Sequence, residues 1–176
     1  MQLSMANCVV INHIRLFVYH FIGKKMKRFH IHLAVDDLAR NIGFYSTLFG
    51  CEPTVRHHDY AKWMLEDPRV NFAISNRGAK LGLDHLGIQA EDGTELQEIK
   101  QRLDATQGTI ETQEQAACCY MRSDKYWITD PQGIAWESFH SLSEIPTFND
   151  QKALSDGENP LACRPTANTA SACCGG

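Results

Sequence analysis

The sequence has no excess of positive charge. Its 17 Lys and Arg side chains are outnumbered by 21 Asp and Glu, so the formal net charge is −4 over 176 residues. Proteins that bind nucleic acid or anionic lipid need a basic surface to attract phosphate. The composition therefore argues against nucleic-acid and membrane-surface partners, and it makes a small molecule the expected partner.

The sequence also lacks a long uninterrupted hydrophobic run. A membrane-spanning helix needs about 20 predominantly apolar residues, but the apolar stretch at 8–23 is interrupted by Asn12, His13, Arg15 and His20. The basic cluster at 24–28 follows this stretch, whereas a secretory signal places its basic residues first. We therefore expect a cytoplasmic protein with reduced thiols.

The cysteines do not suit a disulfide framework, because their number, seven, is odd. Four of them form two adjacent pairs, Cys118-Cys119 and Cys173-Cys174. The second pair lies in residues 151–176, where large apolar side chains are almost absent, so we expect a flexible tail. Two adjacent thiols on such a tail could capture a soft ion.

The N-terminal residues 1–25 fit no fold pattern that continues into the rest of the chain. Met26 directly precedes the first clear strand, so these residues are either an extension upstream of a true start at Met26 or a short helix that covers part of the core. Setting aside both ends leaves one domain at residues 26–150.

Two segments of this domain repeat each other at an offset of 55 residues. Residues 29–37 alternate polar or small side chains with Ile, Leu and Val, a period that predicts a half-buried strand. Residues 84–92 repeat the pattern and align His30 with His85. A helical pattern follows each copy, which indicates a duplicated module.

The predicted fold is α+β, with two β-α-β-β-β modules at residues 27–77 and 83–140. The two helical patterns cover 38–49 and 94–105, and the short strand-like segments that follow them are 51–57, 61–65 and 70–75, then 109–112, 125–129 and 134–140. On the first strand Ile31, Leu33 and Val35 are expected to face the helix, so that His30 and His32 face the other side.

His30, His85 and Glu137 are the candidate metal ligands, since all three face a cavity if the two modules close around one. Two imidazoles and one carboxylate form the facial set of non-haem Fe(II) oxygenases, although the same set can hold Zn, Mn or Ni. The alternative is that the histidines are ordinary core residues. His32 shares the face of His30, but it is not the repeat partner of His85 and is expected beside the site. Three other histidines are expected in solvent: His57, His58 and His140.

Cys118 and Cys119 are candidate soft-ligand residues. Adjacent residues of a strand point to opposite faces, so joint binding requires a loop, which the flanking residues predict. Buried small apolar residues or a strained vicinal disulfide are the alternatives. Lys125 could lower a thiol pKa or anchor a substrate, or it could be an ordinary solvated lysine.

Several motifs together resemble the vicinal oxygen chelate superfamily, which includes glyoxalase I, extradiol dioxygenases and bleomycin-resistance proteins. The matching segments cover most of 27–140 and are His30-x4-Val35-x-Asp37-Leu38, Phe44-Tyr45-x2-Leu48-Phe49-Gly50, Asp84-His85-Leu86-Gly87 and Asp130-Pro131-x-Gly133-x2-Trp136-Glu137. Within it, Ala117-Cys118-Cys119-Tyr120 and Asp124-Lys125-x-Trp127 are similar to the ArsI/CadI group of carbon-arsenic lyases and cadmium-induced proteins.

This resemblance implies Fe(II)- and O2-dependent cleavage of the carbon-arsenic bond of trivalent organoarsenicals, such as methylarsenite and aromatic arsenicals, to arsenite. It implies that His30, His85 and Glu137 bind the metal and that Cys118 and Cys119 bind arsenic. The alternatives are a non-catalytic protein that sequesters cadmium or arsenic, and another dioxygenase-like or glyoxalase-like metalloenzyme. A fourth ligand of the glyoxalase type is missing from residues 70–75. Whether the chain forms a homodimer stays open.

Overall fold

Strand β1 (Arg28–Ala34) opens the part of the chain that the computed structural model describes, residues 26–146. The predictions for residues 1–25 and 151–176 therefore lie outside the described residues. The elements that follow are α2 (Leu38–Phe49), β2 (Val55–Arg56), β3 (Tyr60–Glu66), β4 (Arg69–Ser75), β5 (Gly82–Ala90), α3 (Gly93–Asp104), β6 (Glu111–Cys118), β7 (Met121–Thr129) and β8 (Ala135–Glu144).

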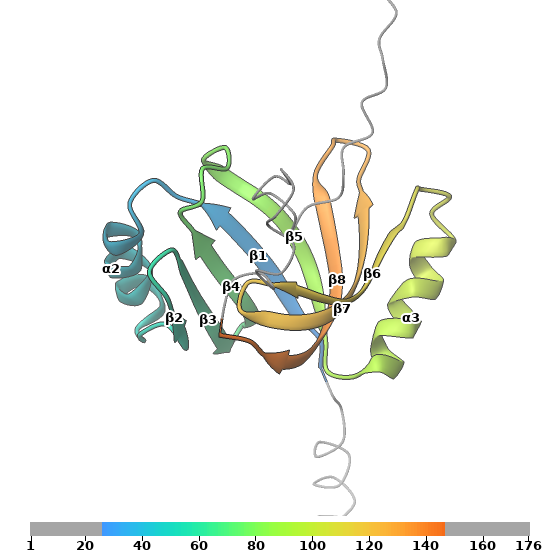
Figure 1. Cartoon of the computed structure of the whole chain (residues 1–176), viewed down its shortest axis with the longest axis horizontal. Coiled ribbons are helices and arrows are strands. Elements are labelled where there is room, and N and C mark those ends of the chain that lie inside the picture. The colour runs from blue at the N-terminus through green and yellow to red at the C-terminus, as the bar shows by residue number, and fades with distance from the viewer. Residues whose placement is uncertain (1–25, 147–176) are drawn as a thin grey trace, which may run out of the picture.

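The strands form one mixed sheet in the order β2-β3-β4-β1-β5-β8-β7-β6. β1 pairs in parallel with β4, and β5 pairs in parallel with β8, so each module has the same topology. The antiparallel pairing of β1 with β5 joins the two modules into a curled half-barrel. Figure 1 shows helices α2 and α3 on opposite sides of it. The predicted pair of β-α-β-β-β modules is confirmed.

The outer face of β1 packs on α2, as the alternation predicts. Ile31, Leu33 and Val35 lie against a core cluster that contains Ile42 of the helix, Trp63 and Phe72. The Asp37 side chain caps α2 by accepting a hydrogen bond from the Arg40 amide at 2.9 Å. Burial of this face leaves the alternate residues of β1 for the concave side of the sheet.

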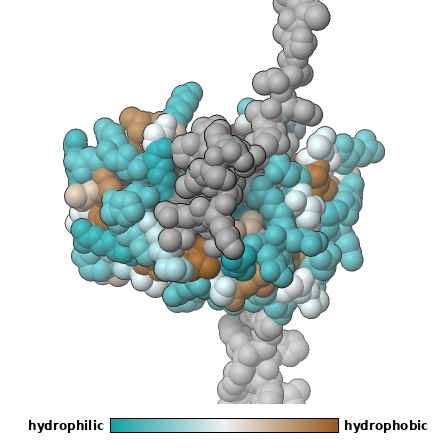
Figure 2. Space-filling view, viewed as in Figure 1, coloured by the Kyte–Doolittle hydropathy of each residue, from teal (hydrophilic) through white to brown (hydrophobic). Residues whose placement is uncertain are grey.

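The second module has the same kind of helix cap at the repeat position. The Asp92 side chain caps α3 by accepting from the Glu95 amide, and Leu96 and Ile99 of this helix pack against Ala90 of β5. The 55-residue repeat is therefore a repeated strand, cap and helix. Figure 2 shows that the face in view is mainly hydrophilic, with scattered hydrophobic side chains. Within residues 26–146, neither helix has the length and apolar character that crossing a bilayer requires.

Three predicted strands differ clearly from the structure, and one of them, 125–129, begins four residues earlier as β7. The segment 51–57 contains only the two-residue strand β2. The predicted strand 109–112 is instead the eight-residue β6, which reaches Cys118 and pairs with β7. Its central residues are polar and a bulge lies between Gln113 and Ala116, so the hydrophobic alternation that signals a strand is missing.

Candidate metal and thiol site

His30, His85 and Glu137 come from three neighbouring strands at the centre of the sheet, β1, β5 and β8. Gly87 of β5 lies in register with both His30 of β1 and Glu137 of β8. His30 and Glu137 are thus two strand spacings apart, roughly 9.6 Å, and no side chain stands between them. A Cβ at Gly87 would lie 2.3 Å from the Glu137 carbonyl oxygen, so this close approach requires glycine.

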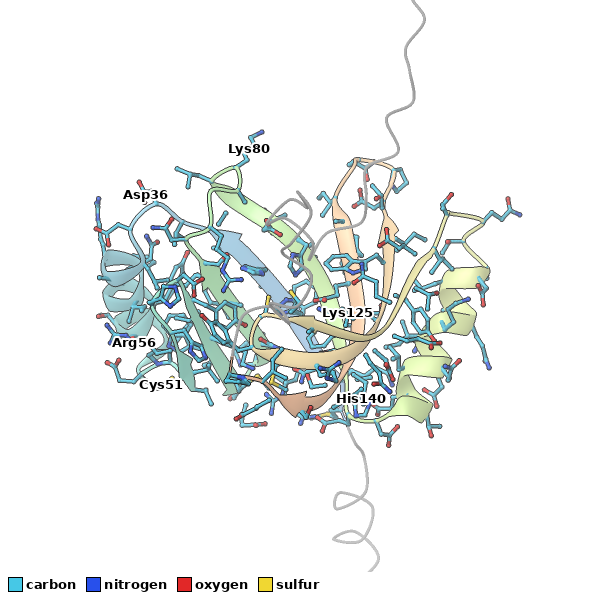
Figure 3. All side chains as sticks on the ribbon, in the orientation of Figure 1. Asp36, Cys51, Arg56, Lys80, Lys125 and His140 are labelled. Atoms are coloured by element: carbon cyan, nitrogen blue, oxygen red, sulfur yellow. The ribbon has the colours of Figure 1, made fainter. Side chains whose placement is uncertain are left out.

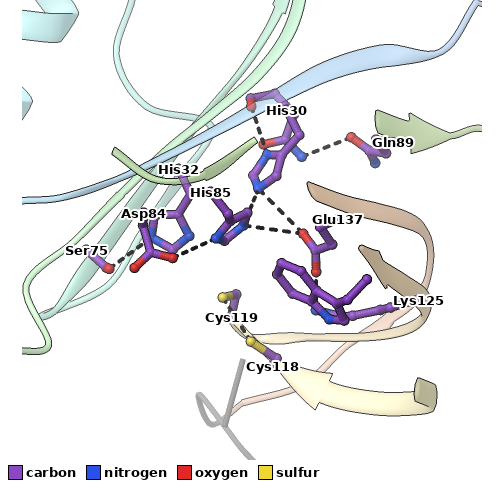
Figure 4. Close-up of polar contacts among 12 residues, drawn as sticks. His30, His32, Ser75, Asp84, His85, Gln89, Cys118, Cys119, Lys125 and Glu137 are labelled. Atoms are coloured by element: carbon purple, nitrogen blue, oxygen red, sulfur yellow. Dashed lines mark hydrogen bonds and ion pairs between the residues drawn. The ribbon is translucent and has the colours of Figure 1, made fainter. Parts of the chain in front are cut away.

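The donor atoms of these three residues converge on one point, as Figure 4 shows. His30 Nε2 lies 3.1 Å from His85 Nε2, and Glu137 Oε2 lies 3.6 Å and 3.5 Å from these two nitrogens. Ligands about 2.1 Å from one ion are separated by roughly 3.0 Å at right angles and roughly 3.4 Å at tetrahedral angles. The donor set therefore fits a single divalent ion with little movement.

The other ring nitrogen of each histidine already has an acceptor. His30 Nδ1 is 3.0 Å from the Asn71 carbonyl oxygen, and His85 Nδ1 is 2.7 Å from Asp84 Oδ1. When each Nδ1 donates its hydrogen to these oxygens, Nε2 keeps a lone pair directed at the cavity. Asp84 and Asn71 were not singled out from the sequence, although the adjacency of Asp84 and His85 is a usable signal.

Burial lowers the pKa values of both histidines, and the partners of His85 separate the two values. Desolvation and the neighbouring His85 lower the pKa of His30 to about 4, so its ring is neutral near pH 7. Burial also lowers the pKa of His85, but its hydrogen bonds with Asp84 and Glu137 outweigh that effect and raise the value above 6.5. A neutral and an easily protonated imidazole thus share the site.

His32 lies beside these residues, as the sequence predicts. Its Nε2 is 2.9 Å from Ser75 Oγ, and its ring is 4.8 Å from that of His85. Burial lowers the pKa of His32 well below 6.5. One ring nitrogen from each of His30, His32 and His85 lies within 4.8 Å of the other two, so this cluster is a second arrangement that could hold a metal.

Lys125 is not a solvated lysine. It is 4% exposed on β7, and its Nζ lies 2.7 Å from Glu137 Oε1. Figure 3 shows it in the interior of the molecule, whereas Lys80 lies at the periphery. Burial alone would raise the pKa of Glu137, but the charge of Lys125 and the hydrogen bond with His85 lower it. One carboxylate oxygen thus contacts the lysine and the other faces the histidines.

The two cysteine sulfurs lie together in the lining of the same cavity. Cys118 is the last residue of β6 and Cys119 begins the two-residue turn to β7, and their Sγ atoms are 3.1 Å apart. Cys119 has a φ of 56° and Tyr120 a φ of 63°, so the chain turns immediately after Cys118. The predicted loop is therefore a tight hairpin turn, and it brings both sulfurs to one side.

The Cys119 thiol is less acidic than Lys125 alone would make it. Burial raises the pKa of Cys119 to about 11, and the nearby charge of Lys125 lowers it only in part. Lys125 thus lowers this thiol pKa, as the sequence suggested, but burial outweighs its effect. Cys119 keeps its proton near pH 7.

A cavity of about 40 Å³ connects the metal-ligand candidates with the sulfurs, and it has room for only a few water molecules. His30, His85, Glu137, Cys118 and Cys119 all line it. The structure thus brings together all the candidate site residues, Lys125 included, and it places His32 among them.

The three histidines expected in solvent behave differently from one another. His58 is exposed, but His140 is half-buried. His57 is also half-buried, and its ring stacks on Tyr120 with the centroids 3.4 Å apart and an interplanar angle of 10°. This contact joins the two modules. The polar residues around His57 do not predict it.

Comparison with known proteins identifies similar sequences. A family model described as the Glyoxalase/Bleomycin resistance protein/Dioxygenase superfamily matches residues 27–138. A trivalent organoarsenical cleaving enzyme from Bacillus sp. (strain MD1) is 37% identical over 161 residues, which are 85% of this chain and 99% of that protein. A cadmium-induced protein CadI from Mycobacterium bovis is 33% identical over 142 residues, 78% of this chain and 93% of that protein.

Solved structures agree with the fold. An extradiol ring-cleaving dioxygenase from B. fuscum superposes with a TM-score of 0.51 at 14% identity, over 69% of this chain and 34% of that one. At this level of identity the similarity concerns the fold alone.

Proposed function

The chain belongs to the glyoxalase/bleomycin resistance protein/dioxygenase superfamily, and from this premise we propose that it cleaves the carbon-arsenic bond of trivalent organoarsenicals to give arsenite. One observation carries the proposal. A set of two imidazoles and a carboxylate faces two adjacent cysteine sulfurs across a single small cavity. The relatives named as organoarsenical cleaving enzymes, at 30–37% identity, support it.

We propose His30, His85 and Glu137 as the ligands of an Fe(II) ion. Two neutral imidazoles and one carboxylate leave coordination positions open, and an iron ion bound there supplies the chemistry that activates O2. Zn, Mn and Ni suit the same donors. Lys125 contacts Oε1 of Glu137 and leaves Oε2 directed at the histidine nitrogens, so it positions the carboxylate.

Cys118 and Cys119 are the proposed binding residues for arsenic, a thiophilic centre. In the reduced protein each thiol forms a sulfur-arsenic bond as one hydroxide leaves arsenic, and the thiol proton departs with it as water. A substrate with two hydroxyl groups and one carbon substituent on arsenic would lose two water molecules. The substituent would then lie in the cavity, on the side of the metal ligands.

The proposed site works in the cytoplasm, where thiols stay reduced. The overall exchange brings no net charge into the buried site, because a neutral thiol and a neutral arsenic hydroxide give a neutral sulfur-arsenic bond and water. The cavity of about 40 Å³ keeps most water away from the reacting atoms.

The test is arsenite release. Reduced protein would be loaded with Fe(II) without oxygen, then given methylarsenite and air, with a phosphine as reductant because dithiols compete for arsenic. We expect release in the wild type and none in Glu137→Ala. Cys118→Ser and Cys119→Ser should lose turnover yet still bind Fe(II), whereas the exposed Cys51→Ser should behave as wild type. Full activity in either of the first two serine variants would refute arsenic binding by the cysteine pair.

A second function has its own support, since other relatives are named cadmium-induced proteins. A protein of that kind could bind a toxic soft ion without catalysis, with the same two sulfurs and the neighbouring histidines as ligands. The same experiment separates the two functions. Stoichiometric arsenic binding with no arsenite release would select sequestration.

A further inference from the structure

The cysteine turn, residues 118–121, has an unusual backbone. Cys119 and Tyr120 both adopt positive φ, a conformation that glycine or asparagine usually occupies in two-residue hairpin turns. Neither residue is of that kind here, so contacts elsewhere must hold the turn in this shape. Cys119 lines the cavity and packs beside Tyr60, whereas Tyr120 makes the hydrogen-bonding and stacking contacts that can anchor the turn.

Tyr120 is 7% exposed, and both its hydroxyl and its ring contact residues of the first module. Its hydroxyl donates a hydrogen bond to Asp59 Oδ1 at 2.7 Å, and its ring stacks on His57. The guanidinium of Arg77 lies 5.7 Å from the ring centroid and pairs with Asp59 Oδ2 at 2.9 Å. Burial and the hydrogen bond to Asp59 raise the pKa of Tyr120 to about 12, so the hydroxyl keeps its proton.

These contacts join opposite ends of the sheet. His57 and Asp59 lie between β2 and β3, at one end of the strand order, while Tyr120 lies between β6 and β7 at the other. The metal-ligand candidates sit on the central strands. The contacts therefore fix how far the sheet curls, and with it the position of the two sulfurs above those central strands.

We propose that Asp59 and His57 are positioning residues, which act through Tyr120 to hold the two cysteine sulfurs facing the metal-ligand set. The proposal rests on the proposed function, because it assigns these residues a role in arsenic binding. It predicts that loosening the Tyr120 contacts weakens arsenic binding while metal binding is unchanged, since no donor atom at His30, His85 or Glu137 contacts Asp59 or His57 in the described residues.

The test uses the full chain, reduced and free of metal, with two separate titrations. Methylarsenite affinity is measured by competition with a small dithiol, and Co(II) affinity is measured from its absorption spectrum. Tyr120→Phe removes only the hydroxyl, Asp59→Ala removes the acceptor, and His57→Ala removes the stacked ring. The control is Asp37→Ala, which removes a helix cap on the outer side of the sheet and lowers stability without touching the site.

We expect Tyr120→Phe and Asp59→Ala each to weaken methylarsenite binding at least tenfold. Their double variant should be no more than about threefold weaker than the worse single variant, because Asp59→Ala already removes the hydrogen bond that Tyr120→Phe removes. Co(II) affinity should stay within threefold in all of them, and Asp37→Ala should change neither affinity. Unchanged methylarsenite affinity in folded Tyr120→Phe and His57→Ala would overturn the proposal, as would an equal loss of Co(II) affinity.

Failure of the proposed function gives a different result. In that case the wild type would not bind methylarsenite through its cysteines, so Cys119→Ser would have the same methylarsenite affinity as the wild type. If Asp59→Ala does not fold, Tyr120→Phe decides, because it leaves the Asp59 and Arg77 ion pair intact.

Discussion

Replacement of Lys125 by Met should strongly destabilise the metal-free protein. Lys125 Nζ lies 2.7 Å from Glu137 Oε1, and both side chains are 5% exposed. At an effective dielectric constant of about 20, two unit charges at this distance attract by ~6 kcal/mol, and desolvation offsets part of that. Removing the lysine leaves a buried carboxylate without its counter-charge, which costs about 3–5 kcal/mol.

Urea denaturation after chelator treatment measures this loss. Lys100→Met is the matched control, because Lys100 also pairs with an acid, Asp104, but on the solvent side of α3. That exposed pair contributes no more than about 0.5 kcal/mol. A loss in Lys125→Met as small as in the control would refute a charged Lys125–Glu137 pair. Bound divalent metal should narrow the gap between wild type and Lys125→Met, since it supplies positive charge beside Glu137.

The loss of stability in Lys125→Met should depend on pH in a direction that the pKa of Glu137 determines. Lys125 and His85 hold the folded-state pKa of Glu137 below the ordinary 4.5, despite the opposing effect of burial. The stability from this carboxylate is therefore complete above pH 4.5 and is lost as pH falls through the folded-state pKa. The loss of stability in acid should therefore be larger in the wild type than in Lys125→Met, where the lysine no longer holds the pKa of Glu137 down. Urea denaturation between pH 7 and pH 3 measures both losses, and losses of equal size would contradict this assignment.

The remaining predictions concern the metal ligands and the strand that carries them. Glu137→Ala should weaken Co(II) binding at least a hundredfold and His32→Ala less than tenfold; the reverse order, seen by titration, would select the three-histidine cluster instead. Co(II) affinity should fall as pH drops through the raised pKa of His85, because the ion must displace that proton, and titrations at pH 6 and pH 8 measure this. Gly87→Ala should lower stability by more than about 2 kcal/mol and weaken Co(II) binding, because the added Cβ would meet the Glu137 carbonyl oxygen. The control is Gly43→Ala in α2, where the added Cβ has open space and should raise the melting temperature.

The repeat made the central strands predictable. A period of two in residues 29–37 and 84–92 identified both the strands and their buried faces, and the equal offset of His30 and His85 placed both histidines on the concave side. Glu137 followed from the same alternation. This worked because one face of β1 and of β5 packs on a helix while the other lies on the concave side of the sheet, so the alternation is set by local packing.

Lys125 could not be placed in this way, because the predicted strand began at that residue and was too short for its alternation to count. The strand begins at Met121, and its inward residues are Ser123, Lys125 and Trp127, which are 2%, 4% and 1% exposed. A lysine at an inward position of a longer alternation would have been a signal for a buried ion pair. Three inward positions are too short a pattern to outweigh the general expectation that a lysine side chain is solvated.

The contact between Tyr120 and Asp59 left no trace in the sequence for a different reason. The residues are 61 positions apart, belong to different modules and have no counterpart at the 55-residue offset. Periodicity describes how each strand faces its own helix, but the distance between the two ends of the sheet depends on its accumulated twist over eight strands. The metal-ligand candidates depend only on neighbouring strands and were predictable. The position of the sulfurs depends on closure of the whole sheet, so it required the three-dimensional structure.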